Sequence, residues 1–155
     1  MATKKKSLPG STEIHLSVQI ASRLPNLPSA TQFKRWMKAA LAQPAEVTVR
    51  VVNAAEGRNL NSAFRGKDHA TNVLTFIYHE SVNDRLQGDI VLCAPVVARE
   101  AREQKKNLTH HYAHLTVHGV LHLAGHDHVA VADADAMEAH EVAILGRLKV
   151  PNPYC

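Results

Sequence analysis

The segment from His118 to His128 restricts the fold more than any other part of the sequence. It places His118, His122, His126 and His128 around Gly125. Two histidines four residues apart on a helix lie nearly one above the other, about 6 Å along the axis, so both imidazoles can bind one ion. Gly125 can adopt a left-handed conformation, which ends a helix and turns the chain back. The sequence therefore predicts a long helix with a metal site at its end.

The third ligand is expected after the turn. His114 shares the helical stripe, but roughly 12 Å of helix separates it from His122, too far for a shared zinc ion at about 2.0–2.1 Å from each nitrogen. His126 or His128 can return to the helix after Gly125. The spacing H-x-x-x-H-x-x-G-x-x-H matches the ligand spacing of the metzincin zinc motif, which selects His128. The predicted ligands of one zinc ion are His118, His122 and His128.

Three imidazoles without a thiolate leave the fourth tetrahedral position for water or substrate, which is typical of a catalytic zinc site. Zinc at such a site lowers the pKa of bound water and polarises an oxygen of the scissile group, so hydrolysis is the expected reaction. Zinc proteases of this pattern have a glutamate base after the first histidine, where this chain has Gly119. Peptidase chemistry is therefore disfavoured. The other histidines of this helix are expected on its surface or behind the ligands: His110, His111 and His114.

Hydrophobic periodicity predicts an α+β domain. Residues 14–20 and 47–51 alternate apolar and polar side chains, as strands with one buried face do. Two further strands are expected at 71–78 and 89–93. The expected helices cover 29–41, where Ser29 and Gln32 form a capping box, and then 53–64, 95–106, 109–124 and 135–148. Strands early and helices late argue against a doubly wound sheet.

Composition fits one domain with a nucleic-acid partner. The chain has 155 residues, 45% of them hydrophobic, and a net charge of +4, which suits a single core and an anionic ligand. Two cysteines without C-x-x-C spacing make a disulfide framework unexpected. There is no apolar stretch of signal-peptide or bilayer length. We expect a cytoplasmic protein with a disordered tip at 1–10 and a single metal-dependent hydrolase domain at 11–155.

Four segments in order resemble YbeY, a family of bacterial endoribonucleases, and the resemblance covers nearly the whole chain. The segments are Asn61–Asp68, Thr71–Phe76, Gly88–Val91 and His118–His128. The histidine motif of this family, HGxLHLxGxDH, has glycine where proteases have glutamate. The resemblance implies a zincin-like α+β fold, in which a small mixed four-stranded sheet packs against helices, and one zinc ion on the three histidines.

The resemblance also implies single-strand-specific RNA cleavage. Members act in maturation of the 3′ end of small-subunit ribosomal RNA and in ribosome quality control, so the implied partners are ribosomal RNA, the ribosome and ribosome-associated proteins. Arg65 matches the motif arginine that is considered important for activity, and our hypothesis is that its charged fork holds the scissile phosphate. His69-Ala70 stands where many members have a lysine-proline pair.

Two other functions remain open from the sequence. One is a zinc-stabilised ribosome-assembly or RNA-binding factor with little turnover, against which the open fourth position argues. The other is a metal hydrolase that acts on a peptide or small ester. Three imidazoles also suit nickel, cobalt or copper, so zinc is a preference.

Overall fold

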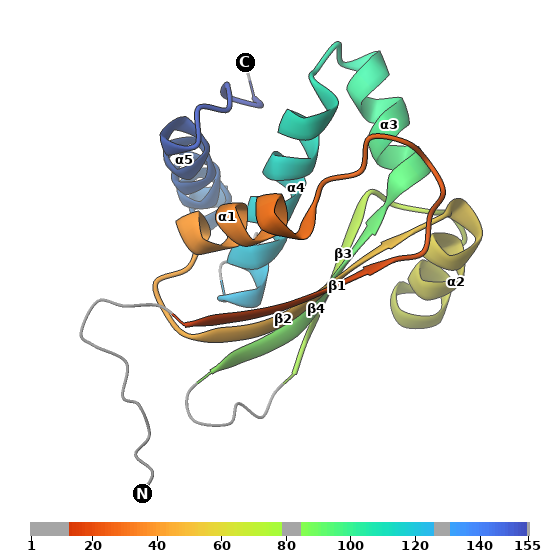
Figure 1. Cartoon of the computed structure of the whole chain (residues 1–155), viewed down its shortest axis with the longest axis horizontal. Helices are drawn as coiled ribbons and strands as arrows, with labels where there is room; N and C mark the ends of the chain where they lie inside the picture. Colours follow the sequence, from red (N-terminus) through yellow and green to blue (C-terminus); the bar gives the residue numbers. More distant parts are fainter. Residues whose placement is uncertain (1–12, 79–84, 126–130, 155) are drawn as a thin grey trace, which may run out of the picture.

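The strands of the described chain form one mixed sheet in the order β1-β2-β4-β3 (Figure 1). The computed structural model describes residues 13–78, 85–125 and 131–154. Within these residues, β1 (Ile14–Ile20), β2 (Ala45–Val52) and β4 (Leu86–Cys93) are parallel, and β3 (Val73–Ile77) pairs antiparallel with β4 at one edge. The predicted α+β class with a mixed four-stranded sheet is confirmed.

Helices cover both faces of this sheet (Figure 1). They are α1 (Ala30–Ala40), α2 (Ala54–Arg65), α3 (Ala94–Glu103), α4 (Leu108–Leu123) and α5 (Val131–Arg147). α1, α4 and α5 lie on one face and α2 on the other. The predicted capping box is present, since the Ser29 hydroxyl accepts from the Gln32 amide at 3.1 Å and the Gln32 side chain accepts from the Ser29 amide at 2.9 Å.

The alternation of β4 produces two hydrophobic clusters, one on each face of the sheet. Ile90 and Leu92 belong to the larger cluster, with Phe33 of α1 and Val120 of α4. Val91 and Cys93 belong to the smaller cluster. Trp36 of α1 is 4% exposed and also lies in the larger cluster. Helix α4 is therefore held on the sheet by the main core.

Two elements, β4 and α5, begin three or more residues before their predicted starts. β4 begins at Leu86 rather than Asp89, because its first residues, which include polar ones, extend the ladder beside β2 without adding to the apolar pattern. α5 begins at Val131 rather than Asp135. The prediction took Asp135 as part of the first turn, whereas it lies one turn inside the helix. In the ranges 13–78, 85–125 and 131–154, no helix has the length and apolar character needed to cross a membrane. The expectation for residues 1–10 lies outside the described residues.

Candidate metal centre

Helix α4 carries three histidines along one stripe. Asn107 caps the helix by accepting from the His110 amide at 3.0 Å. The ring centroids of His118 and His122 are 4.8 Å apart, and those of His114 and His118 are 6.2 Å apart. The structure thus brings His118 and His122 side by side, as their spacing predicts. The third predicted ligand, His128, lies outside the described residues.

The predicted turn after this helix is present. Ala124 is the C-cap of α4, and its amide donates to the Val120 carbonyl at 3.0 Å. Gly125 follows with a backbone φ of +99°, which residues other than glycine rarely adopt. The glycine therefore ends the helix as the sequence predicts. His126 and Asp127 lie outside the described residues, so the path after the turn stays a prediction.

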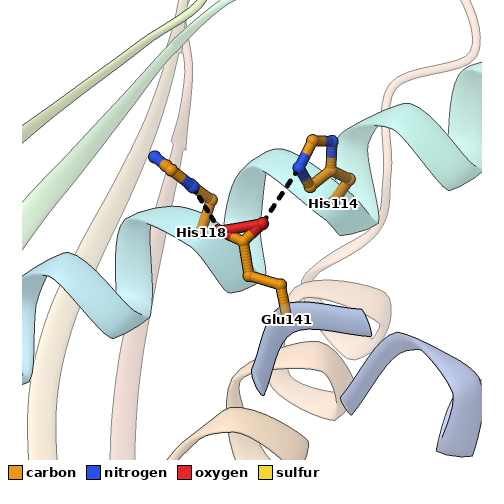
Figure 2. Close-up of side chains that lie close together, drawn as sticks. All are labelled: His114, His118 and Glu141. Carbon is orange, nitrogen blue, oxygen red and sulfur yellow. Dashed lines mark hydrogen bonds and ion pairs between the residues drawn. The ribbon is translucent and has the colours of Figure 1, made fainter. Parts of the chain in front are cut away.

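Glu141 of α5 faces the histidine stripe from behind (Figure 2). Its side chain is completely buried. Its carboxylate accepts short hydrogen bonds from Nδ1 of His118 and from the Tyr154 hydroxyl. Nε2 of His114 lies 3.3 Å from the same carboxylate. The ligand-type atoms of His114, His118 and Glu141 all lie within 4.8 Å of one another and could hold a metal ion.

These hydrogen bonds keep the buried carboxylate charged. Burial on its own raises the pKa of Glu141, but the hydrogen bonds from His114, His118 and Tyr154 outweigh it and lower the pKa to about 2. Burial and the hydrogen bond to Glu141 both raise the pKa of Tyr154. Glu141 is therefore an ionised acceptor, and Tyr154 is a protonated donor, at neutral pH.

The sequence analysis missed Glu141 and Tyr154. A signal for Glu141 does exist, because it lies on the helical stripe of Met137, Ile144 and Leu145, which are all buried. A lone carboxylate on an apolar stripe needs a buried partner, which points to a functional or structural pair. Tyr154 lies beyond α5, and nothing in the local sequence predicts its contact with Glu141.

Gly119 lies where helix α4 approaches the sheet most closely. A Cβ atom at this position would lie 3.3 Å from Cγ2 of Ile90 and 3.3 Å from Cγ2 of Thr75. These contacts are tighter than ordinary van der Waals contact. The position that carries the general base in zinc proteases is therefore closed here by strands β3 and β4, which gives the absence of that glutamate a structural reason.

His111 lies neither on the helix surface nor behind the predicted ligands, the two positions expected for it. Its side chain is 3% exposed, and Nε2 lies 2.9 Å from the Glu100 carboxylate of α3. Burial lowers the pKa of His111 despite this partner. His111 therefore packs α4 against α3, whereas His114 contacts the Glu141 carboxylate.

Arg65 is the last residue of α2 and is exposed. Helices α2 and α4 lie on opposite faces of the sheet, so Arg65 comes from the face away from His118 and His122. Gly66 follows in the left-handed region at φ +69° and ends the helix. The helix thus ends within two residues of its predicted end at 64, and the phosphate contact of Arg65 stays a prediction.

The ends of α2 and α4 nevertheless meet the same end of the β3–β4 pair. The rings of Phe64 and Phe76 make an edge contact with centroids 5.2 Å apart, which attaches the end of α2 to β3. On the other face, a Cβ atom at Gly88 would lie 2.6 Å from Leu123 of α4 and 2.7 Å from the carbonyl oxygen of Phe76. The ends of α2 and α4 therefore contact the same end of the β3–β4 pair from opposite faces.

The loop after Arg65 is fixed to α2. Arg58 forms a bidentate ion pair with Asp68, with N–O distances of 2.7 and 3.0 Å. The buried side chain of Asn61 donates to the carbonyl of His69 at 2.7 Å. Among the described residues, no ion pair of Arg65 itself is found. Arg65 thus has a defined backbone position and a charge that is available to an anion.

A helix with a histidine pair, packed on a mixed sheet with a buried carboxylate behind one imidazole, defines the zincin-like class of metal-dependent hydrolases. Comparison with known proteins makes the class specific. The model of the family Endoribonuclease YbeY matches residues 18–149, and this chain belongs to that family. The family membership that the four segments predict is confirmed. The prediction that the chain is an enzyme is confirmed as well, because this is a family of endoribonucleases.

Two relatives show how far the similarity extends. Endoribonuclease YbeY of Thiobacillus denitrificans is 58% identical over 92% of this chain and 97% of its own length. Endoribonuclease YbeY of Nitrosomonas eutropha is 54% identical over 90% of this chain and 97% of its own length. Among solved structures, the solution structure of TM1509 from Thermotoga maritima shares the fold with a TM-score of 0.53 at 24% identity, covering 86% of this chain and 91% of that one.

Proposed function

We propose that this chain is a zinc-dependent endoribonuclease that cleaves single-stranded RNA, with one zinc ion on His118, His122 and His128. The observation that carries the proposal is the adjacent pair of His118 and His122 with the ionised Glu141 behind it. A carboxylate that accepts from one ring nitrogen of a histidine is the usual support of a metal ligand. Family membership supports the RNA substrate, because the relatives carry the name endoribonuclease.

Two positions for zinc can be compared: one at the pair of His118 and His122, and one among His114, His118 and Glu141. The donor set favours the first. Nδ1 of His118 is committed to Glu141, and Figure 2 shows the second ring nitrogen on the side of the ring away from that carboxylate. An ion held by His114, His118 and Glu141 would have a fully buried carboxylate as one of its ligands. Such burial suits a closed structural site. We therefore propose that the ion binds to the pair of His118 and His122, whose ring centroids are 4.8 Å apart.

When bound, zinc supplies a Lewis acid that polarises the scissile phosphodiester and activates the attacking oxygen. The protein side chains supply orientation and charge. Glu141 accepts a hydrogen bond from His118, and Gly119 brings the helix close to the sheet without contributing a base. Arg65, at the end of α2, holds a phosphate of the RNA with its planar charged fork.

Replacing Arg65 with alanine should lower RNA cleavage about a hundredfold or more, since charge-assisted phosphate clamps contribute several kcal/mol to phosphoryl transfer. Arg65→Lys should recover only part of the activity, because lysine lacks the bidentate geometry. Single-turnover cleavage of a labelled single-stranded RNA measures both. Lys67→Ala, two residues further along the chain, is the matched control for lost positive charge. Equal cleavage by Arg65→Ala and the parental protein would show that the arginine has no role at the phosphate.

Removing the metal distinguishes this enzyme from a zinc-stabilised RNA-binding factor. A chelator should abolish RNA cleavage, and added zinc should restore it, because the ion is part of the reaction site. In the alternative function, chelation mainly lowers the melting temperature, and the RNA affinity follows the folded fraction. Parallel measurement of cleavage and of thermal unfolding, with and without chelator, separates the two. Cleavage that persists after complete removal of metal would count against zinc chemistry.

For the biological role, we propose maturation of the 3′ end of small-subunit ribosomal RNA and ribosome quality control in the cytoplasm. The net charge of +4 supports binding to the ribosome or its RNA. Ribosome-associated proteins are the further partners that this role implies. The domain at residues 11–155 is proposed to carry the whole activity.

A further inference from the structure

The C-terminal segment of the chain reaches the metal centre through side chains to which the family motif assigns no role. Val150 is 8% exposed and belongs to the main core, which anchors the segment after α5. Lys106 donates from Nζ to the carbonyl oxygen of Pro153 at 2.9 Å. These contacts hold Tyr154, whose hydroxyl donates to Glu141. The end of the chain is thus connected to the residue behind His118.

The two carboxylate oxygens of Glu141 have separate donors. Oε2 accepts from Nδ1 of His118. Oε1 accepts from the Tyr154 hydroxyl and lies 3.3 Å from Nε2 of His114. A fully buried carboxylate is costly unless its lone pairs have donors. Tyr154 and His114 therefore offset the cost of burying Oε1, and Oε2 is left to accept from His118.

We propose that Glu141 is a positioning residue for the metal ligand His118, and that Tyr154 holds Glu141 in place. A carboxylate that accepts from Nδ1 fixes the proton on that nitrogen, sets the ring orientation and makes Nε2 a stronger metal ligand. The inference rests on the proposed function, because it takes His118 as a zinc ligand. It adds the two residues that the sequence motif does not contain, one on α5 and one in the C-terminal segment.

The test is zinc affinity, measured on the full chain by competition with a chromophoric chelator. Glu141→Gln keeps the size of the side chain and removes its charge, and we expect it to weaken zinc binding about 10- to 100-fold. Tyr154→Phe removes a hydroxyl from a residue that is 45% exposed, and we expect a loss of up to about tenfold in the same direction. Nitrogen-15 NMR of the zinc-loaded protein should show the proton of His118 on Nδ1.

The chain offers a matched control for each variant. Glu100 accepts from His111 of the same helix α4 at 2.9 Å, so Glu100→Gln breaks an equivalent carboxylate–imidazole pair away from the metal centre. The hydroxyl of Tyr78 donates to Asp89, so Tyr78→Phe removes an equivalent tyrosine–carboxylate bond. Both controls should bind zinc with parental affinity. Thermal unfolding in the presence of chelator measures the stability lost by each variant without a contribution from the ion.

Each outcome decides for or against the positioning role. Weaker zinc binding in Glu141→Gln and Tyr154→Phe, with parental affinity in both controls, supports it. Parental affinity in Glu141→Gln overturns it and leaves the proposed function intact. Complete loss of zinc in Glu141→Gln, as in a variant that lacks a ligand, overturns it by making Glu141 a direct ligand. If the parental chain binds no zinc while folded, the proposed function fails, and this inference fails with it.

Discussion

Replacing His122 with alanine should reduce cleavage of a single-stranded ribosomal RNA fragment at least about a thousandfold, because several kcal/mol of transition-state stabilisation depend on the ion. The variant should also lose most of its zinc affinity, since two of the three imidazoles hold a metal poorly. The fold should survive, because His122 is only half-buried at the end of α4. Cleavage by zinc-loaded parental and variant protein, purified identically, provides the measurement.

His110→Ala is the matched control for this prediction. It removes an imidazole from the first turn of the same helix, where the backbone amide is capped by Asn107. Its cleavage rate and zinc content should equal those of the parental protein. Equal cleavage by parental protein and His122→Ala would mean that the activity comes from a contaminant or another site. No cleavage by either would favour a role that depends on a partner, or a role without catalysis.

The substitution Gly119→Glu should destabilise the fold by at least about 3 kcal/mol, a large part of the total stability of a small domain. It would introduce the glutamate of zinc proteases at a position where even a Cβ atom lies 3.3 Å from Ile90 and Thr75. Overpacking costs about 1–3 kcal/mol, and an unpaired carboxylate against an apolar sheet adds to this cost. Urea unfolding in the presence of chelator measures the effect without a contribution from the metal.

Gly146→Glu is the control for the chemical change itself. Gly146 lies in helix α5, is exposed, and would have nothing within 4 Å of an added Cβ atom. Its replacement should change stability by no more than about 1 kcal/mol. Gly119→Ala should fall between the two, because the added methyl group meets the tight contact while the helix propensity improves. A Gly119→Glu variant as stable as Gly146→Glu would show that α4 can move away from the sheet at little cost.

The sequence contains enough local signal for most of the fold. Alternating apolar residues predict β1 and β2, and a capping box predicts α1 to within a residue. These signals are reliable because one buried face imposes a period on the residues that form it. β4 shows the limit, since its first residues pair with β2 and β3 but contribute no apolar period. Boundaries set by pairing between distant segments leave no trace in the local pattern.

For the metal centre, the sequence by itself determined the residues that are close along one helix. The pair of His118 and His122 and the left-handed turn at Gly125 follow from the pitch of a helix and the freedom of glycine. Only the tertiary structure decided that Glu141 and Tyr154 lie behind His118, and that strands β3 and β4 close the position of Gly119. The physical reason is that helix spacing fixes neighbours within one element, whereas neighbours from different elements depend on how those elements pack.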